Sequence, residues 1–164
     1  MMIDKPTLVQ AIMTKLELEL SNAITAAETA RLAATDDESA AETQYDTLGL
    51  EASYLAHGQS ERAELIKQQI LQYQKLVMKT FDQDDEIALG AVIELSAPNK
   101  HKTIYFIGPS AGGLKLCLSA GEIFVITPQS PLAQQLIGKF QFDQINLPGH
   151  NQRAGTCSEI VAVY

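Results

Sequence analysis

The fold is decided first by residues 7–34, which read TLVQAIMTKLELELSNAITAAETARLAA. This stretch is rich in strong helix formers and contains no proline or glycine, so it predicts an α-helix. Pro6 suits the start of a helix, and Asp4 is a candidate N-cap before it. Apolar side chains then recur at a spacing of four residues, which predicts one apolar helical stripe. Its members are Leu8, Ile12, Leu16, Leu20 and Ile24. We expect this first helix over about residues 6–34.

A second apolar stripe predicts a partner helix over about residues 36–79. Its members recur at spacings that include three, four and seven residues, as in paired helices: Tyr45, Leu48, Ala52, Leu55, Ile66, Ile70, Tyr73 and Val77. Thr35 and Glu38 have the spacing of a capping box at its start. Because a short connection joins the two stripes, we expect an antiparallel coiled-coil hairpin. Gly49 and Gly58 interrupt the second helix, and nothing in the sequence explains them.

After residue 80 the hydrophobic pattern changes to that of short strands. Residues 81–86 are mostly acidic and indicate a solvated linker, which we extend to residue 89. Ser130 and Pro131 predict the N-cap and first position of a short helix that ends at Gly138. Apolar runs separated by glycine and proline turns predict the strands: residues 92–95, 103–107, 114–118, 122–126 and 156–163. The expected fold is therefore α+β, with a helical hairpin over residues 1–80, a linker over 81–89, and a small antiparallel sheet domain over 90–164.

The net charge of −8 is concentrated in the first half of the chain. Residues 1–86 contain 7 Lys+Arg and 16 Asp+Glu, whereas residues 87–164 contain 5 and 4. A free nucleic-acid binder needs a basic face to displace counterions from phosphates, so this class is disfavoured. An acidic half instead favours a protein partner with a positive or metal-bearing surface.

Several other classes are disfavoured by the sequence. No apolar run approaches the roughly 18 residues of a membrane span, and the N-terminus lacks the pattern of a secretory signal. Cys117 and Cys157 form neither a disulfide framework nor a metal-ligand cluster, so we expect a cytoplasmic protein. Cys117 is expected in the core, and Cys157 has no neighbouring base that would make it a nucleophile. Isolated histidines are expected in surface or loop positions: His57, His101 and His150.

The most specific stretch is residues 124–139, which read FVITPQSPLAQQLIGK. It resembles the GreA/GreB family of bacterial transcript cleavage and elongation factors, in which a similar strand precedes Ser-Pro, an apolar residue, Ala, and later Leu, an apolar residue, Gly and Lys. Residues 90–93 (GAVI) resemble the family's entry into the same domain, and residues 42–45 (ETQY) loosely match its Asn-Ala-Glu-Tyr after the hairpin tip. The resemblance covers nearly the whole chain, and it is mostly architectural in the N-terminal half.

This resemblance implies a role at RNA polymerase. In the family, an FKBP-like sheet domain docks near the mouth of the polymerase's secondary channel, and the coiled coil enters the channel. Acidic tip residues there help to hold a Mg²⁺ ion and a water at the polymerase's active site. By resemblance, the tip residues are Asp36, Asp37, Glu38 and Glu42, and the docking residues are Gln129, Ser130, Pro131 and Leu132. The factor stimulates the polymerase's own cleavage of backtracked transcripts and is not itself an enzyme.

The resemblance also has implications for metal binding, nucleic-acid contact and oligomeric state. The Mg²⁺ ion belongs jointly to the factor and the polymerase active site, with no metal held stably by the free protein. Contact with nascent RNA and DNA is indirect, and we expect a monomer. Between Arg31 and Arg62 there is no Lys or Arg, which disfavours direct RNA contact by this stretch.

The tip departs from the family pattern, which keeps alternatives open. The family carries Asp-x-x-Glu, whereas no acid follows Asp36, Asp37 or Glu38 at that spacing. These acids also suit helix capping, because carboxylates in a first turn complement the helix dipole. Helix-start chemistry likewise accounts for Ser130 and Pro131. A non-cleaving or inhibitory secondary-channel regulator, such as the related Gfh-type inhibitors, is therefore the first alternative.

Two further alternatives belong to other classes of protein. One is a coiled-coil interaction protein without a polymerase role. The other is a peptidyl-prolyl isomerase, which is suggested by an FKBP-like sheet alone. An aromatic content of 6% with no Trp disfavours the apolar pocket of an isomerase, and a fold alone does not carry a function.

Overall fold

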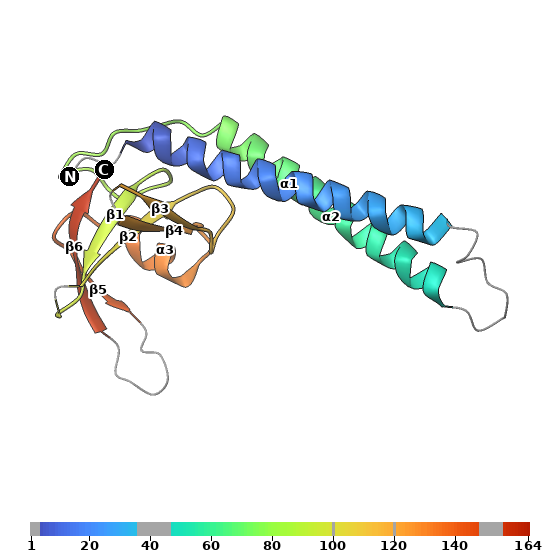
Figure 1. Ribbon diagram of the computed structural model, residues 1–164. Coiled ribbons are helices and arrows are strands. Elements are labelled where there is room, and N and C mark those ends of the chain that lie inside the picture. The colour runs from blue at the N-terminus through green and yellow to red at the C-terminus, as the bar shows by residue number, and fades with distance from the viewer. Residues whose placement is uncertain (1–3, 36–46, 100, 120, 148–155) are drawn as a thin grey trace. The chain divides into compact units, whose positions relative to one another are not determined.

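The computed structural model describes residues 4–35, 47–99, 101–119, 121–147 and 156–164. These residues form a pair of long helices, a sheet and a short helix (Figure 1), which confirms the α+β class. In chain order the elements are α1 (Lys5–Thr35), α2 (Leu48–Gln74), β1 (Val92–Ser96), β2 (Lys102–Ile107), β3 (Lys115–Leu118), β4 (Gly121–Ile126), α3 (Pro131–Leu136), β5 (Gln144–Leu147) and β6 (Thr156–Val163).

The chain divides into two compact units. The first, which we term the hairpin unit, is Met13–Leu71. The second, which we term the sheet unit, combines Met1–Ile12 with Gln72–Tyr164. The first turns of α1 and the last turn of α2 therefore belong to the sheet unit, and both are described with it. The domain limits predicted at residues 80 and 90 stay predictions.

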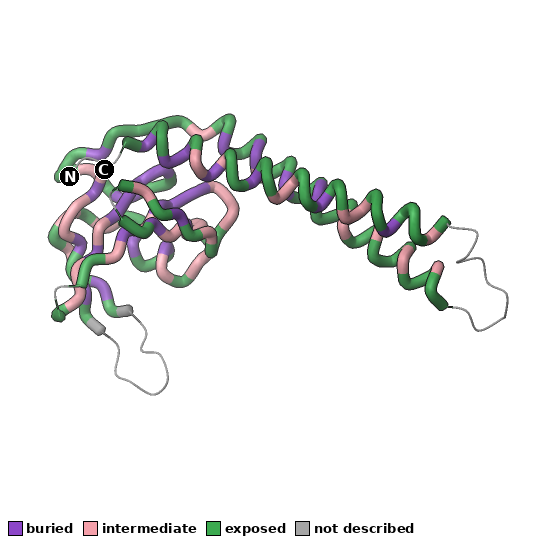
Figure 2. The backbone as a smooth tube through the Cα atoms, viewed as in Figure 1, coloured by how far each residue is buried: buried purple, intermediate pink, exposed green. Residues whose placement is uncertain are grey.

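Within the hairpin unit, α1 and α2 run antiparallel and side by side, as predicted (Figure 1). Figure 2 shows buried and half-buried positions along the facing sides of the two helices. On α2 these positions are spaced by four and three residues, which keeps one stripe facing a partner helix: Ala52, Ala56, Gln59, Ala63, Ile66 and Ile70. The predicted stripe is wrong at Leu48 and Leu55, which are 67% and 56% exposed, because the half-buried positions are Gly49 and Ala56, one residue after each.

The stripe predicted on α1 is confirmed in its first half and wrong at its end. Leu8, Ile12 and Leu16 are buried, whereas Ile24 is 49% exposed. With 3.6 residues per turn, a strict spacing of four drifts around the helix by about 40° per step. The seam of α1 instead continues through small side chains, with Ala23 and Ala30 buried and three neighbours half-buried: Ala26, Ala27 and Ala34.

The helix ends differ from prediction mainly at the end of α2. Asp4 caps α1 as expected, because its carboxylate accepts a hydrogen bond from the Thr7 backbone N–H at 3.2 Å. Helix α2 ends at Gln74 rather than near residue 79, and Val77 is 81% exposed. The Leu76 N–H bonds to the Tyr73 carbonyl at 3.2 Å, which tightens the last turn and ends the helix. The predicted start of α2 lies outside the described residues.

The strands form one sheet in the order β3-β4-β2-β1-β6-β5 (Figure 1). In the part of the chain that the structure describes, β2 and β4 pair in parallel and every other neighbouring pair is antiparallel. The sheet is therefore mixed rather than wholly antiparallel. Strand β5 was not predicted, because the four residues QINL are too short to show a period. Its residues pair with β6, with Ile145 opposite Ser158.

The core of the sheet unit includes part of the predicted linker. Ile93, Leu95 and Ile160 come from the central strands and are at most 2% exposed. Phe81 and Ile87 join the same cluster at 5% and 0% exposure. The solvated interpretation of residues 81–86 is therefore wrong for Phe81, although the acids that follow it are mostly exposed, and Ile87 in the extension of the linker is buried as well.

Cys117 is also placed differently from the prediction. It is exposed on β3, whereas its neighbour Leu116 is 8% exposed. Because side chains alternate between the two faces of a strand, burying Leu116 turns Cys117 outward. Cys157 is exposed as well. Over the described residues, no helix has the length and apolarity needed to cross a membrane.

Candidate functional site

The predicted tip acids, Asp36, Asp37, Glu38 and Glu42, lie outside the described residues, so their role stays a prediction. The last turns of α1 lead toward them. There Arg31 and Glu28 form an exposed ion pair at 2.7 Å, and hydrogen bonding from Arg31 lowers the pKa of the Glu28 carboxyl. Among the residues that are described, no group of His, Cys, Asp and Glu could hold a metal ion.

The four predicted docking residues lie together where the chain turns after β4 and enters the first residues of α3, a segment that we term the docking turn (residues 127–132). The Ser130 N–H closes the turn on the Thr127 carbonyl at 2.8 Å. The Ser130 hydroxyl oxygen then accepts a hydrogen bond from the Ala133 N–H at 3.2 Å, so Ser130 is the N-cap and Pro131 opens the helix, as predicted. Gln129 and Pro131 are exposed, whereas Leu132 is half-buried against the core.

Helix α3 is held to the sheet unit at both its face and its end. Ala133 and Leu136 are fully buried. After Leu136 the chain turns through Gly138, whose φ of 81° is in the left-handed region that favours glycine. The Gly138 N–H bonds to the Ile87 carbonyl at 2.9 Å, and the Ile87 N–H bonds to the Lys139 carbonyl at the same distance. These contacts fix the docking turn on a packed scaffold.

A groove of about 670 Å³ lies beside the docking turn, entirely within the sheet unit. We term it the lysine groove. Because its residues come from distant parts of the chain, no sequence pattern predicts it. The segment after α2 lines it together with one end of the sheet: Gln72, Lys75, Leu76, Val77, Lys79, Leu89, Pro109, Pro128 and Gln129.

The charges of the lysine groove are of one sign. Lys75 and Lys79 line it, and no Asp or Glu does. Lys79 forms an ion pair with Asp85 at 3.0 Å, and Asp85 also accepts a hydrogen bond from the Asp82 N–H. These two hydrogen bonds lower the pKa of the Asp85 carboxyl, with the backbone bond contributing most. No ion pair of Lys75 is formed within the described part of the chain.

Tyr73 joins the end of α2 to the turn after β2. Its side chain is 2% exposed, and its hydroxyl donates a hydrogen bond to the Ser110 carbonyl at 2.8 Å. Burial raises the pKa of the Tyr73 hydroxyl well above its usual value. A Cβ at Gly108 would overlap this hydroxyl, so glycine permits the close approach. The same turn contains Ala111, whose φ of 57° is unusual for a residue with a side chain.

Lys5 lies in a second buried contact of the sheet unit. Its ammonium group donates to the Lys79 carbonyl at 2.5 Å and lies 4.5 Å from the centre of the Phe81 ring. The Lys79 ammonium lies 4.9 Å from the same ring. Burial, with a smaller contribution from the positive charge of Lys79, lowers the pKa of Lys5 to about 8. This arrangement ties the first turn of α1 to the segment that follows α2.

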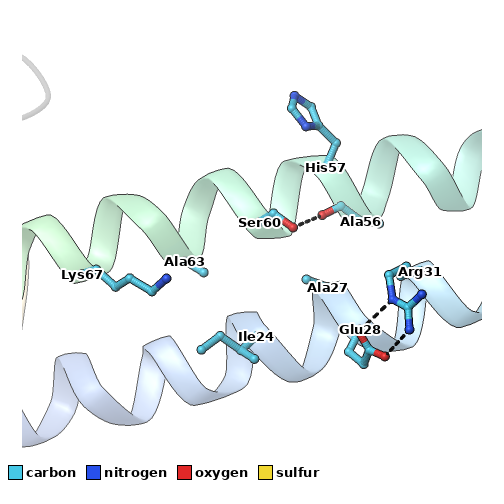
Figure 3. Close-up of a pocket in the computed structure, with 9 residues that line it drawn as sticks. All are labelled: Ile24, Ala27, Glu28, Arg31, Ala56, His57, Ser60, Ala63 and Lys67. Carbon is cyan, nitrogen blue, oxygen red and sulfur yellow. Dashed lines mark hydrogen bonds and ion pairs between the residues drawn. The ribbon is translucent and has the colours of Figure 1, made fainter.

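The hairpin unit contains an open groove of about 610 Å³ between its helices. Figure 3 shows side chains from both helices around it, including Ala27 on α1 and Ala56 on α2. The Ser60 hydroxyl is turned back to the Ala56 carbonyl at 2.8 Å. Small side chains leave this part of the seam unfilled. We term it the alanine groove.

The chain has distant similarity to several solved structures. Gfh1 of Thermus thermophilus, a GreA factor homologue, is 18% identical with a TM-score of 0.38, over 93% of this chain and 94% of that chain. Gfh1 of Thermus aquaticus is 19% identical with a TM-score of 0.41, over 94% and 92%. The elongation factor GreA/GreB from Nitrosomonas europaea is 14% identical with a TM-score of 0.37, over 63% and 90%. No family model and no curated protein matches the chain.

Proposed function

We propose that this chain is a transcription elongation factor that binds RNA polymerase, inserts its helical hairpin into the secondary channel and stimulates cleavage of backtracked transcripts. The observation that carries the proposal is the docking turn. Residues 130–139 resemble the GreA/GreB pattern of Ser-Pro followed by Ala, Leu and Gly-Lys, and the docking turn folds into a capped helix start with Gln129 and Pro131 exposed.

The hairpin supports the proposal by its shape and charge. At 1.5 Å per residue, the part of α1 that lies in the hairpin unit, residues 13–35, gives a helix of about 35 Å, which suits entry into a narrow channel. The predicted tip carries carboxylates, whose oxygens are the ligands that Mg²⁺ prefers. A second metal ion at a polymerase active site can activate water and stabilise the leaving oxygen in phosphodiester cleavage.

In this account the chain is not an enzyme and contributes ligands to the active site of its partner. Asp36, Asp37, Glu38 and Glu42 would contribute to a Mg²⁺ site shared with the polymerase. The docking turn would hold the factor in place, so that the carboxylates are presented at a high effective concentration. Contact with nucleic acid would be indirect, the factor would act in the cytoplasm, and it would bind as a monomer.

Binding and activity are separated by two variants. Pro131→Ala should weaken binding of the factor to purified bacterial RNA polymerase while the circular dichroism spectrum stays unchanged. The double change Asp36→Ala with Asp37→Ala should abolish stimulated cleavage and leave binding intact. Undiminished affinity of Pro131→Ala would contradict docking by this turn. Equal loss of binding and activity in the tip variant would indicate a folding or capping role for its acids.

A second candidate is an inhibitory regulator on the same scaffold. The altered spacing of the tip acids favours it, because a different carboxylate arrangement can occupy the channel without positioning the metal and water. In that case the wild-type chain would bind polymerase, and it would slow transcript cleavage below the polymerase's intrinsic rate instead of accelerating it.

A further inference from the structure

We propose that the lysine groove is a second docking site, and that it receives an acidic segment of the partner protein that carries an apolar side chain. The identity of the partner as RNA polymerase rests on the proposed function. The groove adjoins the docking turn, because Pro128 and Gln129 line it. A partner segment bound at the turn can therefore continue into the groove without a break.

Charge complementarity selects an acidic occupant. The chain carries a net charge of −8, yet the groove is lined by two lysines and by no acid. Lys79 already forms an ion pair with Asp85. Lys75 forms no ion pair with another described residue, so its ammonium group can pair with a carboxylate of the partner. A partner carboxylate in the groove would lie near positive side chains. On the rest of the acidic chain the same carboxylate would be repelled.

The apolar lining indicates that the partner segment also buries a hydrophobic side chain. Val77 is 81% exposed and Leu89 is 42% exposed, and the rings of Pro109 and Pro128 lie beside them. Apolar side chains gathered in one exposed groove with a polar rim are typical of a protein-binding surface. Gln72 and Gln129 add amide groups that can bond to a peptide backbone.

The groove is preformed, so binding need not order it. The Tyr73 hydroxyl joins the segment after α2 to the Ser110 carbonyl, and Gly108 packs against the same hydroxyl. The Gly108 N–H in turn bonds to the Ile126 carbonyl at 2.9 Å, directly before the docking turn. The segment after α2 and the end of the sheet, which form the two sides of the groove, are thus held in place by the same contacts. Because these segments are already ordered, binding costs less conformational entropy.

The decisive experiment compares two charge reversals of the full chain in a binding titration with RNA polymerase at low and moderate salt. Since Lys75→Glu both removes an attraction and adds a repulsion, each worth a few-fold in affinity at an exposed site, it should raise the dissociation constant about tenfold and reduce its salt dependence. Lys102→Glu makes the same charge change on an exposed side chain of the sheet unit, at the end of β2 away from Ile107 and the docking turn, and should change the constant less than about twofold. Leu89→Ser tests the apolar lining and should weaken binding with no change in salt dependence.

A second arm tests the groove without polymerase. A synthetic peptide of alternating Asp and Leu is titrated into the wild-type chain while hydrogen exchange is followed. Protection of residues 72–79 that is lost in Lys75→Glu is the expected result. An absence of such protection, or equal polymerase affinity of Lys75→Glu and wild type, overturns the inference. If a single-stranded RNA oligonucleotide protects these residues and the peptide does not, the groove binds nucleic acid and the inference is also wrong.

These arms separate failure of the groove from failure of the proposed function. If the wild-type chain and Lys75→Glu bind polymerase equally well, the proposed function stands, and the proposal that the groove is a docking site is wrong. If the wild-type chain binds the peptide but not polymerase, the groove still binds acidic segments. The proposed function and the assignment of polymerase as the partner are then both refuted.

Discussion

Filling the alanine groove should stabilise the hairpin unit. Ala56 is half-buried and lines the groove opposite residues of α1, including Ala27 (Figure 3). Replacing it with leucine adds three carbon atoms at a position where the space between the helices is unfilled. A leucine at this seam position also extends the apolar packing that Ile66 and Ile70 provide further along α2.

The expected gain in the free energy of unfolding of Ala56→Leu follows from the area of apolar surface removed from water. Each buried methylene contributes about 0.8 kcal/mol, so three give an upper limit of about 2.4 kcal/mol. The groove is open on one side, and we therefore expect about half of this, or about 1 kcal/mol. Leucine is almost as good a helix former as alanine, so the change in helix propensity subtracts little.

The assay is urea unfolding followed by circular dichroism at the helix band, with Ala33→Leu as the matched control. Ala33 is exposed on α1, so the same chemical change there fills no groove and should alter the free energy of unfolding by less than about 0.5 kcal/mol. A gain in Ala56→Leu of about 1 kcal/mol over the control is expected. Equal values for the two variants, or a loss in Ala56→Leu, would refute the reasoning that the seam is underfilled.

Three further results are expected in the sheet unit. Tyr73→Phe leaves the Ser110 carbonyl without its donor and should lower the free energy of unfolding by about 1–2 kcal/mol in a urea titration, whereas an unchanged value would show that water replaces the hydroxyl. Ser130→Ala removes the N-cap of α3 and should cost about 1 kcal/mol with weaker polymerase binding; Ser130→Asn, which can also cap, should restore both. The pKa of Lys5 is lowered to about 8 in the fold, so between pH 8 and its ordinary value of 10.5 the unfolded chain binds more protons and stability should rise with pH. That rise should be absent in Lys5→Met, and an identical pH profile in the two proteins would contradict it.

Much of the fold could be predicted because local signals agreed with the final packing. The capping residues Asp4 and Ser130 act where the sequence places them, and the early stripe of α1 is buried. The errors occurred where a local pattern competes with a tertiary one. A spacing of four predicts a stripe through Ile24, whereas the paired helix imposes a seam that alternates three and four and passes through alanines.

The end of α2 and the groove beside it could not be predicted for a related reason. Val77 continues the apolar period of the helix, but the chain leaves the helix at Gln74, and Val77 lies exposed in the lysine groove. The capped start of α3 at Ser130 and Pro131 could be predicted because its residues are adjacent in sequence, and the docking role assigned to it stays a prediction. The lysine groove was missed because Lys75, Leu89 and Pro109 meet through long-range packing, which single-sequence patterns do not encode.

The most direct test of the central claim is a transcript cleavage assay. Purified protein is added to a stalled, backtracked RNA polymerase complex with Mg²⁺, and the length of the RNA is followed over time beside an active Gre factor. The account predicts shortening of the transcript faster than the polymerase's intrinsic rate, and loss of that acceleration in the Asp36→Ala, Asp37→Ala double variant. An RNA that is shortened no faster than by polymerase alone, while the control factor is active, would contradict the claim that this chain stimulates cleavage.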